Sequence, residues 1–246
     1  IEVPITFHVV QLSNGFGGID SSTIMQELEK VNSVYLIAGI RFYKCQNINY
    51  IANSNYTTFL KTTSEDLSDL HDRSGTLNIY FVPDLIKVSN GDTISLCGYA
   101  HMFNKDRVFM DNDCSDNGST VLHEIGHYMS LYHTHSTANG QEYVNGSNCM
   151  FAGDGFCDTP ADPKLSSSDV NSICIYTTND TDPNGDIYQP DVNNLMAYGR
   201  KSCREHFSQE QMDQMNYYTA NNHQHLSCTP ASLPSNKLEH IKVVKD

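Results

Sequence analysis

The chain has 246 residues, 39% of them hydrophobic and 18% charged, which is the composition of a folded globular protein and not of a disordered one. Its formal net charge of −14 argues against nucleic acid as a partner, because no basic stripe is present to neutralise phosphates. The charge is compatible with basic peptides or calcium as partners, and equally with an acidic surface that only confers solubility. No apolar run reaches the ~20 residues that a membrane-spanning helix needs, so no membrane span is predicted.

Hydrophobic patterns predict the first elements of the chain. Period-two alternation predicts a strand over Val3–Val10, and helical spacing predicts a helix that Ser21 and Ser22 cap and that runs to about Ala38. Further strands are predicted at 40–43 and 77–82. The polar stretch 47–74 has no assignable pattern.

A β-hairpin is predicted between Cys97 and Cys114. Strands at 98–103 and 108–110 flank the turn 104–107, and the two cysteines lie equidistant from its centre. In that register they face each other across the strands, at a separation that suits a disulfide.

The second half of the chain changes character. Residues 140–190 are rich in Gly, Asn, Asp, Ser and Pro, which predicts loops held by disulfides or ions. Helical spacing returns over 207–218, with Ser208 as its cap. Residues 229–246 are interpreted as a linker or C-terminal extension.

The eight cysteines bear on the compartment. No pair has the C-x2-C spacing of a structural zinc knuckle, so disulfides are favoured over a cysteine metal site. Disulfides persist in oxidising compartments, and we therefore expect a secreted or extracellular protein.

The segment that carries chemistry is His123-Glu124-Ile125-Gly126-His127, on a helix predicted to open at Ser119 or Thr120. Positions i and i+4 share one helix face, so His123 and His127 can bind one metal ion. Glu124 can then reach a zinc-bound water without being a ligand, and activate it as a general base.

A third ligand is predicted at His133, six residues beyond His127. This requires the helix to stop near Ser130 and the chain to turn sharply. Three histidines leave one coordination position open, as in a catalytic zinc site. His135 and Glu142 are the rival ligands.

The motif H-E-I-G-H-Y-M-S-L-Y-H over 123–133 resembles the extended zinc motif of the metzincin metalloproteases, H-E-x-x-H-x-x-G-x-x-H. Within that clan the chain resembles the pappalysin (ulilysin-like) family from about Val3 to Tyr218. The segments that carry this closer resemblance are Leu131–Thr134, the G-D-x-x-x-D-T-P-A segment Gly153–Ala161, and the Met-turn Asn194–Tyr198, followed by Ser202-Cys203 and Phe207.

The resemblance implies an α+β, metzincin-like fold. A twisted mixed β-sheet and the active-site helix form an upper sub-domain at about 1–133, and a loop-rich lower sub-domain with a C-terminal helix spans about 134–228. Together they make a catalytic domain over 1–228.

The resemblance also implies roles for residues of the Met-turn. Met196 forms a hydrophobic floor beneath the zinc, and Tyr198 hydrogen-bonds the tetrahedral intermediate; alternatively both are ordinary core residues. One position departs from the family pattern. Ser130 replaces a glycine that permits the turn, and a non-glycine residue at positive φ costs about 1–2 kcal/mol.

Two segments are candidate calcium sites. The loop Asp180-x-Asp182-x-Asn184-Gly185-Asp186 resembles the first half of an EF-hand loop, although an Asx-rich surface turn explains it equally well. The family resemblance implies a second candidate made of Asp154, Asp158 and Thr159.

For the disulfides, the resemblance places Cys203 where related enzymes tie down the Met-turn, and Cys174 is the partner that we expect. Cys149 and Cys157 would close a short loop. Cys45 and Cys228 remain, and pair by elimination.

The function predicted from the sequence is a secreted, monomeric, zinc-dependent endopeptidase that hydrolyses peptide or protein substrates, with Zn²⁺ as cofactor and Ca²⁺ as a further candidate ion. The alternative is a non-catalytic secreted binding module or toxin subunit that retains a zinc site. Retention of Glu124 argues against this alternative, because a structural site needs no base beside its ligand.

Overall fold

A computed structural model describes residues 1–61, 64–103 and 105–228. Its strands are β1 (Glu2–Gln11), β2 (Arg41–Lys44), β3 (Asn49–Ala52), β4 (Thr58–Leu60), β5 (Leu77–Val82), β6 (Asp84–Ser89), β7 (Asp92–Ser95), β8 (Gly98–Ala100) and β9 (Arg107–Asp111). Its α-helices are α1 (Ser21–Tyr35), α2 (Ser64–His71), α3 (Thr120–Tyr128) and α4 (Gln209–Asn222), and its 3-10 turns are η1 (Leu36–Ala38), η2 (Ser54–Tyr56), η4 (Asn112–Cys114) and η5 (Lys201–Cys203).

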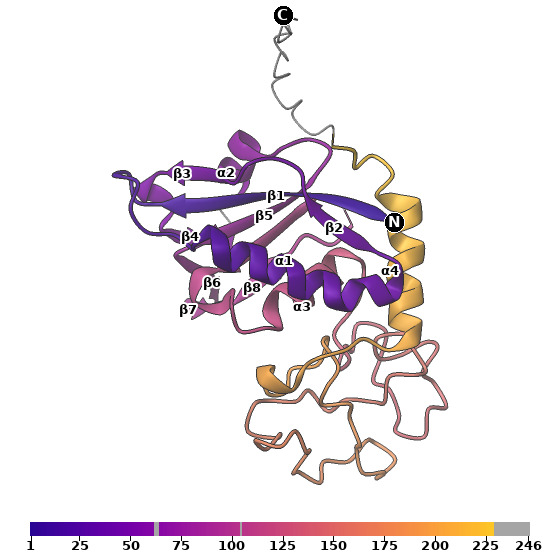
Figure 1. Cartoon of the computed structure of the whole chain (residues 1–246). Helices are drawn as coiled ribbons and strands as arrows, with labels where there is room; N and C mark the ends of the chain where they lie inside the picture. Colours follow the sequence, from indigo (N-terminus) through magenta and orange to yellow (C-terminus); the bar gives the residue numbers. More distant parts are fainter. Residues whose placement is uncertain (62–63, 104, 229–246) are drawn as a thin grey trace, which may run out of the picture.

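The main sheet is mixed and has the order β2-β1-β5-β9-β8, with β3 pairing the far end of β1 (Figure 1). Strands β2, β3 and β5 all run parallel to β1, and β9 runs parallel to β5. Strand β8 is antiparallel to β9 and forms one edge of the sheet. Because β1 is covered on both faces, Val3–Val10 is buried throughout instead of on one face only.

Two hydrophobic cores lie on opposite faces of this sheet. Helices α1 and α3 cover one face, where apolar residues of β1, β5 and β9 pack against Ile24, Leu28, Val121 and Ile125. Helix α2 and the small sheet β4-β6-β7 cover the other face, where Tyr80 and Phe109 stack. The mixed sheet with its few helices confirms the predicted α+β class.

Residues 129–208 form a loop region beneath α1 and α3 (Figure 1). Within residues 129–208 the structure shows only η5 and isolated β-bridges, which agrees with the prediction of loops for 140–190. Helix α4 returns to the sheet layer, where Met215 is buried and the Asn216 side-chain amide donates a hydrogen bond of 2.8 Å to the Ala38 carbonyl. The predicted sub-domain boundaries stay a prediction, and residues 229–246 lie outside the described residues.

Several predicted elements agree with the structure and others need correction. The strand over 77–82 has the predicted bounds, and Ser208 caps α4 through a complete capping box with Gln211. The predicted serine cap of the first helix is wrong. Asp20 is the N-cap and its side chain makes no cap bond, while Ser21 already lies in the helix. The helix becomes 3-10 over 36–38.

The four disulfides of the structure join the predicted pairs, which are Cys45–Cys228, Cys97–Cys114, Cys149–Cys157 and Cys174–Cys203. The predicted register of the hairpin is wrong in one respect. The Cys97 carbonyl accepts from the Asp111 amide, and Cys114 lies beyond the strand in η4, so the two cysteines are not opposite each other. Within the described part of the chain, no helix has the length and apolar character needed to cross a bilayer.

Candidate metal centre and active site

The end of α3 has the turn that a third histidine ligand requires. The Leu131 amide donates to the Gly126 carbonyl and the Ser130 amide donates to the His127 carbonyl, which is the Schellman pattern of a helix C-terminus. Ser130 has φ 75°, in the left-handed region where glycine is usual. The helix ends at Tyr128, and the chain reverses so that His133 faces the helix again.

Three histidine side chains converge at this turn. The Nε2 atoms of His123 and His127 are 3.1 Å apart, and the His133 Nε2 lies 3.2 Å from the first and 2.9 Å from the second. Among the described residues they form the only group of three or more potential metal ligands whose donor atoms meet. Tetrahedral zinc with its usual Zn–N distances separates its nitrogen ligands by about 3.3 Å, which fits this arrangement.

The other ring nitrogens explain why a cation fits here. The His123 Nδ1 donates to the Leu195 carbonyl at 2.7 Å, and the His127 Nδ1 donates to the Leu131 carbonyl at 2.8 Å. A carbonyl only accepts, so Nδ1 carries the proton and the Nε2 lone pairs point at one another. Burial lowers the pKa of His123 well below its usual range and that of His127 to about 4, so both rings are neutral at pH 7. Neutral lone pairs at this separation repel unless a cation lies between them.

Glu124 lies beside the three histidines and lines the same cleft. Its side chain is buried, and burial raises the pKa of its carboxyl to about 8, against the smaller opposing effect of nearby positive charges. Strand β8 passes close to it at Gly98. A Cβ atom added to Gly98 would lie 2.8 Å from the Glu124 Cγ, so the glycine leaves room for the carboxylate.

The Met-turn lies directly under α3. Met196 is fully buried, and a Cβ atom added to Gly126 would lie 2.7 Å from its Sδ, so the glycine of the zinc motif permits this approach. The Tyr198 ring centroid lies 4.4 Å from that of His133, and the ring lines the cleft. The cleft has a volume of about 300 Å³, and its lining includes the residues of β8 together with Tyr132, His133 and Ser136.

The rival zinc ligands lie outside the three-histidine group. His135 stacks on His133 with ring centroids 4.9 Å apart, and its Nδ1 is buried without a partner. Glu142 lies instead against Gly153, and the charge of Asp154 adds to the effect of burial in raising the pKa of Glu142. Burial is the larger cause of the raised pKa of Glu142, to about 8.

The candidate calcium residues are only partly brought together. The Thr159 hydroxyl donates to Asp154 at 2.9 Å, whereas the Asp158 carboxylate accepts from the Glu210 amide at the start of α4. In the other loop, Asp182 accepts from the backbone amides of Val144, Asn184 and Asp186, and Asp180 accepts from the hydroxyls of Tyr176 and Thr178.

Sequence reasoning missed the carbonyls of Leu195 and Leu131 as partners of the histidines. Every residue has a backbone carbonyl, so the residue type does not show which carbonyl will accept a hydrogen bond. Only the position of Leu195 and Leu131 next to the known motifs could have indicated them. It also missed Gly98 and the contact between Glu142 and Gly153, both of which depend on how distant segments pack.

The fold and the three-histidine centre define the chain as a metalloprotease of the metzincin type. The peptidase M43 family, described as Pregnancy-associated plasma protein-A, matches residues 91–220, which is more than half of the chain. The chain belongs to this family, and the predicted resemblance to pappalysins is confirmed.

Related proteins agree with this assignment. An extracellular metalloprotease of Sordaria macrospora is 29% identical over 238 residues, which cover 89% of this chain and 74% of that protein. One of Neurospora crassa has the same identity and coverage. The solved structure of Tannerella forsythia mature mirolysin, in complex with a cleaved peptide, superposes with a TM-score of 0.63 and 18% identity, over 94% of this chain and 98% of that chain. It confirms the metzincin fold.

Proposed function

We propose that this chain is a secreted zinc endopeptidase in which Glu124 is the general base. The observation that carries the proposal is the convergence of three neutral imidazoles beside a buried carboxylate in one cleft. Four disulfides, and relatives that are named extracellular metalloproteases, support secretion.

His123, His127 and His133 would hold the metal ion. Their nitrogen ligands suit zinc, and three protein ligands leave a coordination position open. Zinc supplies Lewis acidity that polarises the carbonyl of the scissile peptide bond. The carbonyls of Leu195 and Leu131 fix the rings of two of these ligands in the orientation that binding needs.

Glu124 would move the proton. Its carboxylate accepts a proton from the attacking water as the water oxygen bonds to the carbonyl carbon, and then donates that proton to the amide nitrogen as the C–N bond breaks. Burial raises the pKa of Glu124 and a bound cation beside it would lower that pKa, so the carboxyl group can serve in both protonation states. The same residue can therefore act first as base and then as acid.

Tyr198 would stabilise the charge that develops on the carbonyl oxygen. Its ring packs on His133 and is 39% exposed, so the phenol is accessible from the cleft. Burial raises the pKa of Tyr198, which keeps the hydroxyl protonated and able to donate a hydrogen bond to an oxyanion.

The substrate would bind in extended form along β8. This strand lines the cleft, and within the described residues it is one edge of the main sheet. An edge strand offers backbone donors and acceptors to a peptide, which can add to the sheet as one more strand.

A calcium ion would bind between Glu142 and Asp154. The Glu142 Oε2 is buried without a partner, and Asp154 is buried and already contacts Thr159. Carboxylate and hydroxyl oxygens are the ligands that calcium prefers, and a cation would remove the desolvation penalty of both acids. We propose this site, with Thr159, in place of the set that includes Asp158.

The proposal is tested with Glu124→Gln and, as the matched control, Glu205→Gln on the surface. We expect the first variant to retain one zinc per chain by elemental analysis and to lose at least about a hundredfold in peptide cleavage. The control should cleave like the wild type, and a zinc chelator should abolish cleavage by both. A wild-type protein that binds zinc but cleaves no peptide of a diverse library would favour the binding-module alternative.

A further inference from the structure

The third histidine of the metal centre is oriented differently from the other two. The Nδ1 atoms of His123 and His127 each donate to a backbone carbonyl, at 2.7 and 2.8 Å. Among the described residues the Nδ1 of His133 has no such acceptor, and the polar contacts of its ring are those that its Nε2 makes with the other two ligands. A hydrogen bond at the second ring nitrogen is what usually fixes a histidine ligand. Another contact therefore has to orient the His133 ring.

The backbone around His133 is held in place by its neighbours. The Ser136 amide donates to the His133 carbonyl at 2.9 Å and closes a tight turn. The Thr134 amide donates to the Met196 carbonyl at 3.3 Å, and the Thr134 hydroxyl donates to the Asp162 carboxylate at 2.6 Å. Because these bonds fix the backbone, the freedom that remains at this ligand is the rotation of its imidazole about the side-chain bonds.

The ring of His135 lies flat against the ring of His133. Their centroids are 4.9 Å apart and their planes differ by 9°, which is the geometry of an offset stack. The Tyr198 ring contacts both of them, with centroids 4.4 Å from His133 and 4.5 Å from His135. The Nδ1 of His135 is buried without a hydrogen-bond partner in the described part of the chain. What His135 offers its neighbour is therefore the face of its ring.

We propose that His135 is a positioning residue for the metal centre, and that its stacked ring holds the His133 imidazole in the orientation that metal binding needs. This inference rests on the proposed function, in which His133 is a zinc ligand. A bound cation draws electron density from the imidazole, and the face of a neighbouring aromatic ring attracts the positive charge that results. The stack therefore favours the metal-bound state over the metal-free state. His135 acts through His133 and needs no contact with the metal ion.

The size of the effect follows from the contact that is lost. Removal of a residue that orients a metal ligand weakens metal binding by about 10- to 100-fold. An aromatic stack by itself accounts for about 2- to 12-fold. We expect a loss near the lower end of the first range, about tenfold, because the Tyr198 ring stays in contact with His133 and retains part of its orientation.

The test compares wild type with His135→Phe and His135→Leu. Both variants lack the ring nitrogens, but the first keeps a flat ring and the second fills similar space without one. The matched control is His225→Ala, which removes a histidine that contacts Asp106 and lies outside the group of three ligands. The readouts are the zinc dissociation constant, from competition with a chromophoric chelator, and the absorption spectrum of the cobalt-substituted protein, which reports ligand geometry. Thermal melting of the metal-free proteins establishes that each variant is folded.

We expect His135→Leu to bind zinc about tenfold more weakly than wild type and to change the cobalt spectrum, and His135→Phe and His225→Ala to bind like wild type. Wild-type affinity in His135→Leu would show that the stack contributes nothing, and an equal loss in His135→Phe would show that a ring nitrogen is required. Either result overturns the inference while the endopeptidase function stands. If His135→Leu shows the expected loss but the zinc-loaded wild type cleaves no peptide, the endopeptidase function fails and the inference stands.

Discussion

The side-chain amide of Gln214 on α4 donates a hydrogen bond of 3.0 Å to the hydroxyl of Ser130, in the turn that directs His133 to the metal centre. The two residues are 84 positions apart in the chain. This contact gives the non-glycine residue at φ 75° a partner that glycine would lack. The helix α4 therefore supports the turn before His133 through a hydrogen bond to the Ser130 hydroxyl. A glycine at position 130 could not accept this bond.

We predict that Ser130→Ala lowers the free energy of unfolding by about 1 kcal/mol, because the hydrogen bond is lost and the backbone strain remains. Ser130→Gly should be nearly neutral, since relief of about 1 kcal/mol of strain offsets the lost bond. Urea unfolding measures both. The control is a double-mutant cycle with Gln214→Ala. In the Gln214→Ala background, Ser130→Ala should lower the free energy of unfolding only slightly further. Strict additivity of the two substitutions would show that the contact contributes nothing.

The sequence was most informative where a pattern is local. The β-branched and aromatic run Leu77–Val82 has the predicted bounds, and Ser208 followed by Gln211 marks the start of α4. The spacing of the extended motif over 123–133 also predicts that His123, His127 and His133 converge, as they do in the structure. By contrast, β3 has the sequence Asn-Tyr-Ile-Ala and extends only because it pairs with the end of β1. The Gln214–Ser130 contact and the approach of Glu142 to Asp154 join distant segments, and no local pattern contains them.

Gly98 is predicted to be a positioning residue for Glu124. In Gly98→Ala the added methyl group would lie 2.8 Å from the Glu124 Cγ and 3.1 Å from its Oε1, so the carboxylate must move. A displacement of about 1 Å at a reacting group can cost up to a hundredfold in rate. We expect kcat to fall at least about tenfold, with KM and thermal stability little changed. In a Glu124→Gln background the same substitution should have almost no further effect, and an equal loss in both backgrounds would mean that Gly98 acts by another route.

Calcium is predicted to stabilise the loop region through Glu142 and Asp154. Burial raises the pKa of Glu142 to about 8 and that of Asp154 to about 7, so without a cation the folded state holds protons that the unfolded state releases near pH 4. The stability that these two groups contribute is therefore fully present below about pH 4 and is lost as the pH rises through 7 to 8. A bound calcium ion replaces the protons, so its stabilising effect should increase over the same range.

Thermal melting with calcium or magnesium chloride at pH 6 and pH 8.5 measures this effect on zinc-loaded protein. We expect calcium to raise Tm by several degrees at pH 8.5 and by less at pH 6. Glu142→Gln should remove the response, whereas Asp180→Asn in the other candidate loop should retain it. The opposite result for the two variants would place the calcium site in the loop around Asp182.

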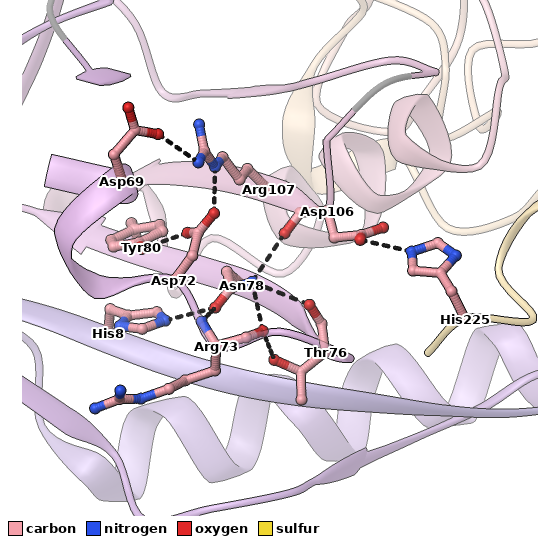
Figure 2. A network of polar contacts seen from close by, with 10 residues as sticks. All are labelled: His8, Asp69, Asp72, Arg73, Thr76, Asn78, Tyr80, Asp106, Arg107 and His225. Atoms are coloured by element: carbon pink, nitrogen blue, oxygen red, sulfur yellow. Dashed lines mark hydrogen bonds and ion pairs between the residues drawn. The ribbon is translucent and has the colours of Figure 1, made fainter. Parts of the chain in front are cut away.

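His8 is predicted to make the fold sensitive to acid. It is fully buried in β1, stacks on Tyr80, and lies in the polar network of Figure 2, where its Nε2 donates to the Asn78 side-chain oxygen at 2.9 Å. Its Nδ1 accepts a hydrogen bond from the Asn49 side-chain amide. Protonation of the ring at Nδ1 would therefore break this hydrogen bond. Burial lowers its pKa to about 4 from 6.5.

Between pH 4 and 6.5 the unfolded state therefore binds one more proton at this position than the folded state. The contribution is fully present above pH 6.5 and is lost as the pH falls to about 4, to a total of about 3 kcal/mol. We predict that His8→Phe, which retains the stacking, flattens the dependence of the unfolding free energy on pH by one proton over this range. Ile5→Val, on the same strand, should lower the whole curve by about 1 kcal/mol without changing its slope. Both proteins contain the same zinc-site histidines, so equal slopes for His8→Phe and Ile5→Val in urea unfolding at pH 4, 5, 6 and 7 would exclude His8 as the acid-sensitive group.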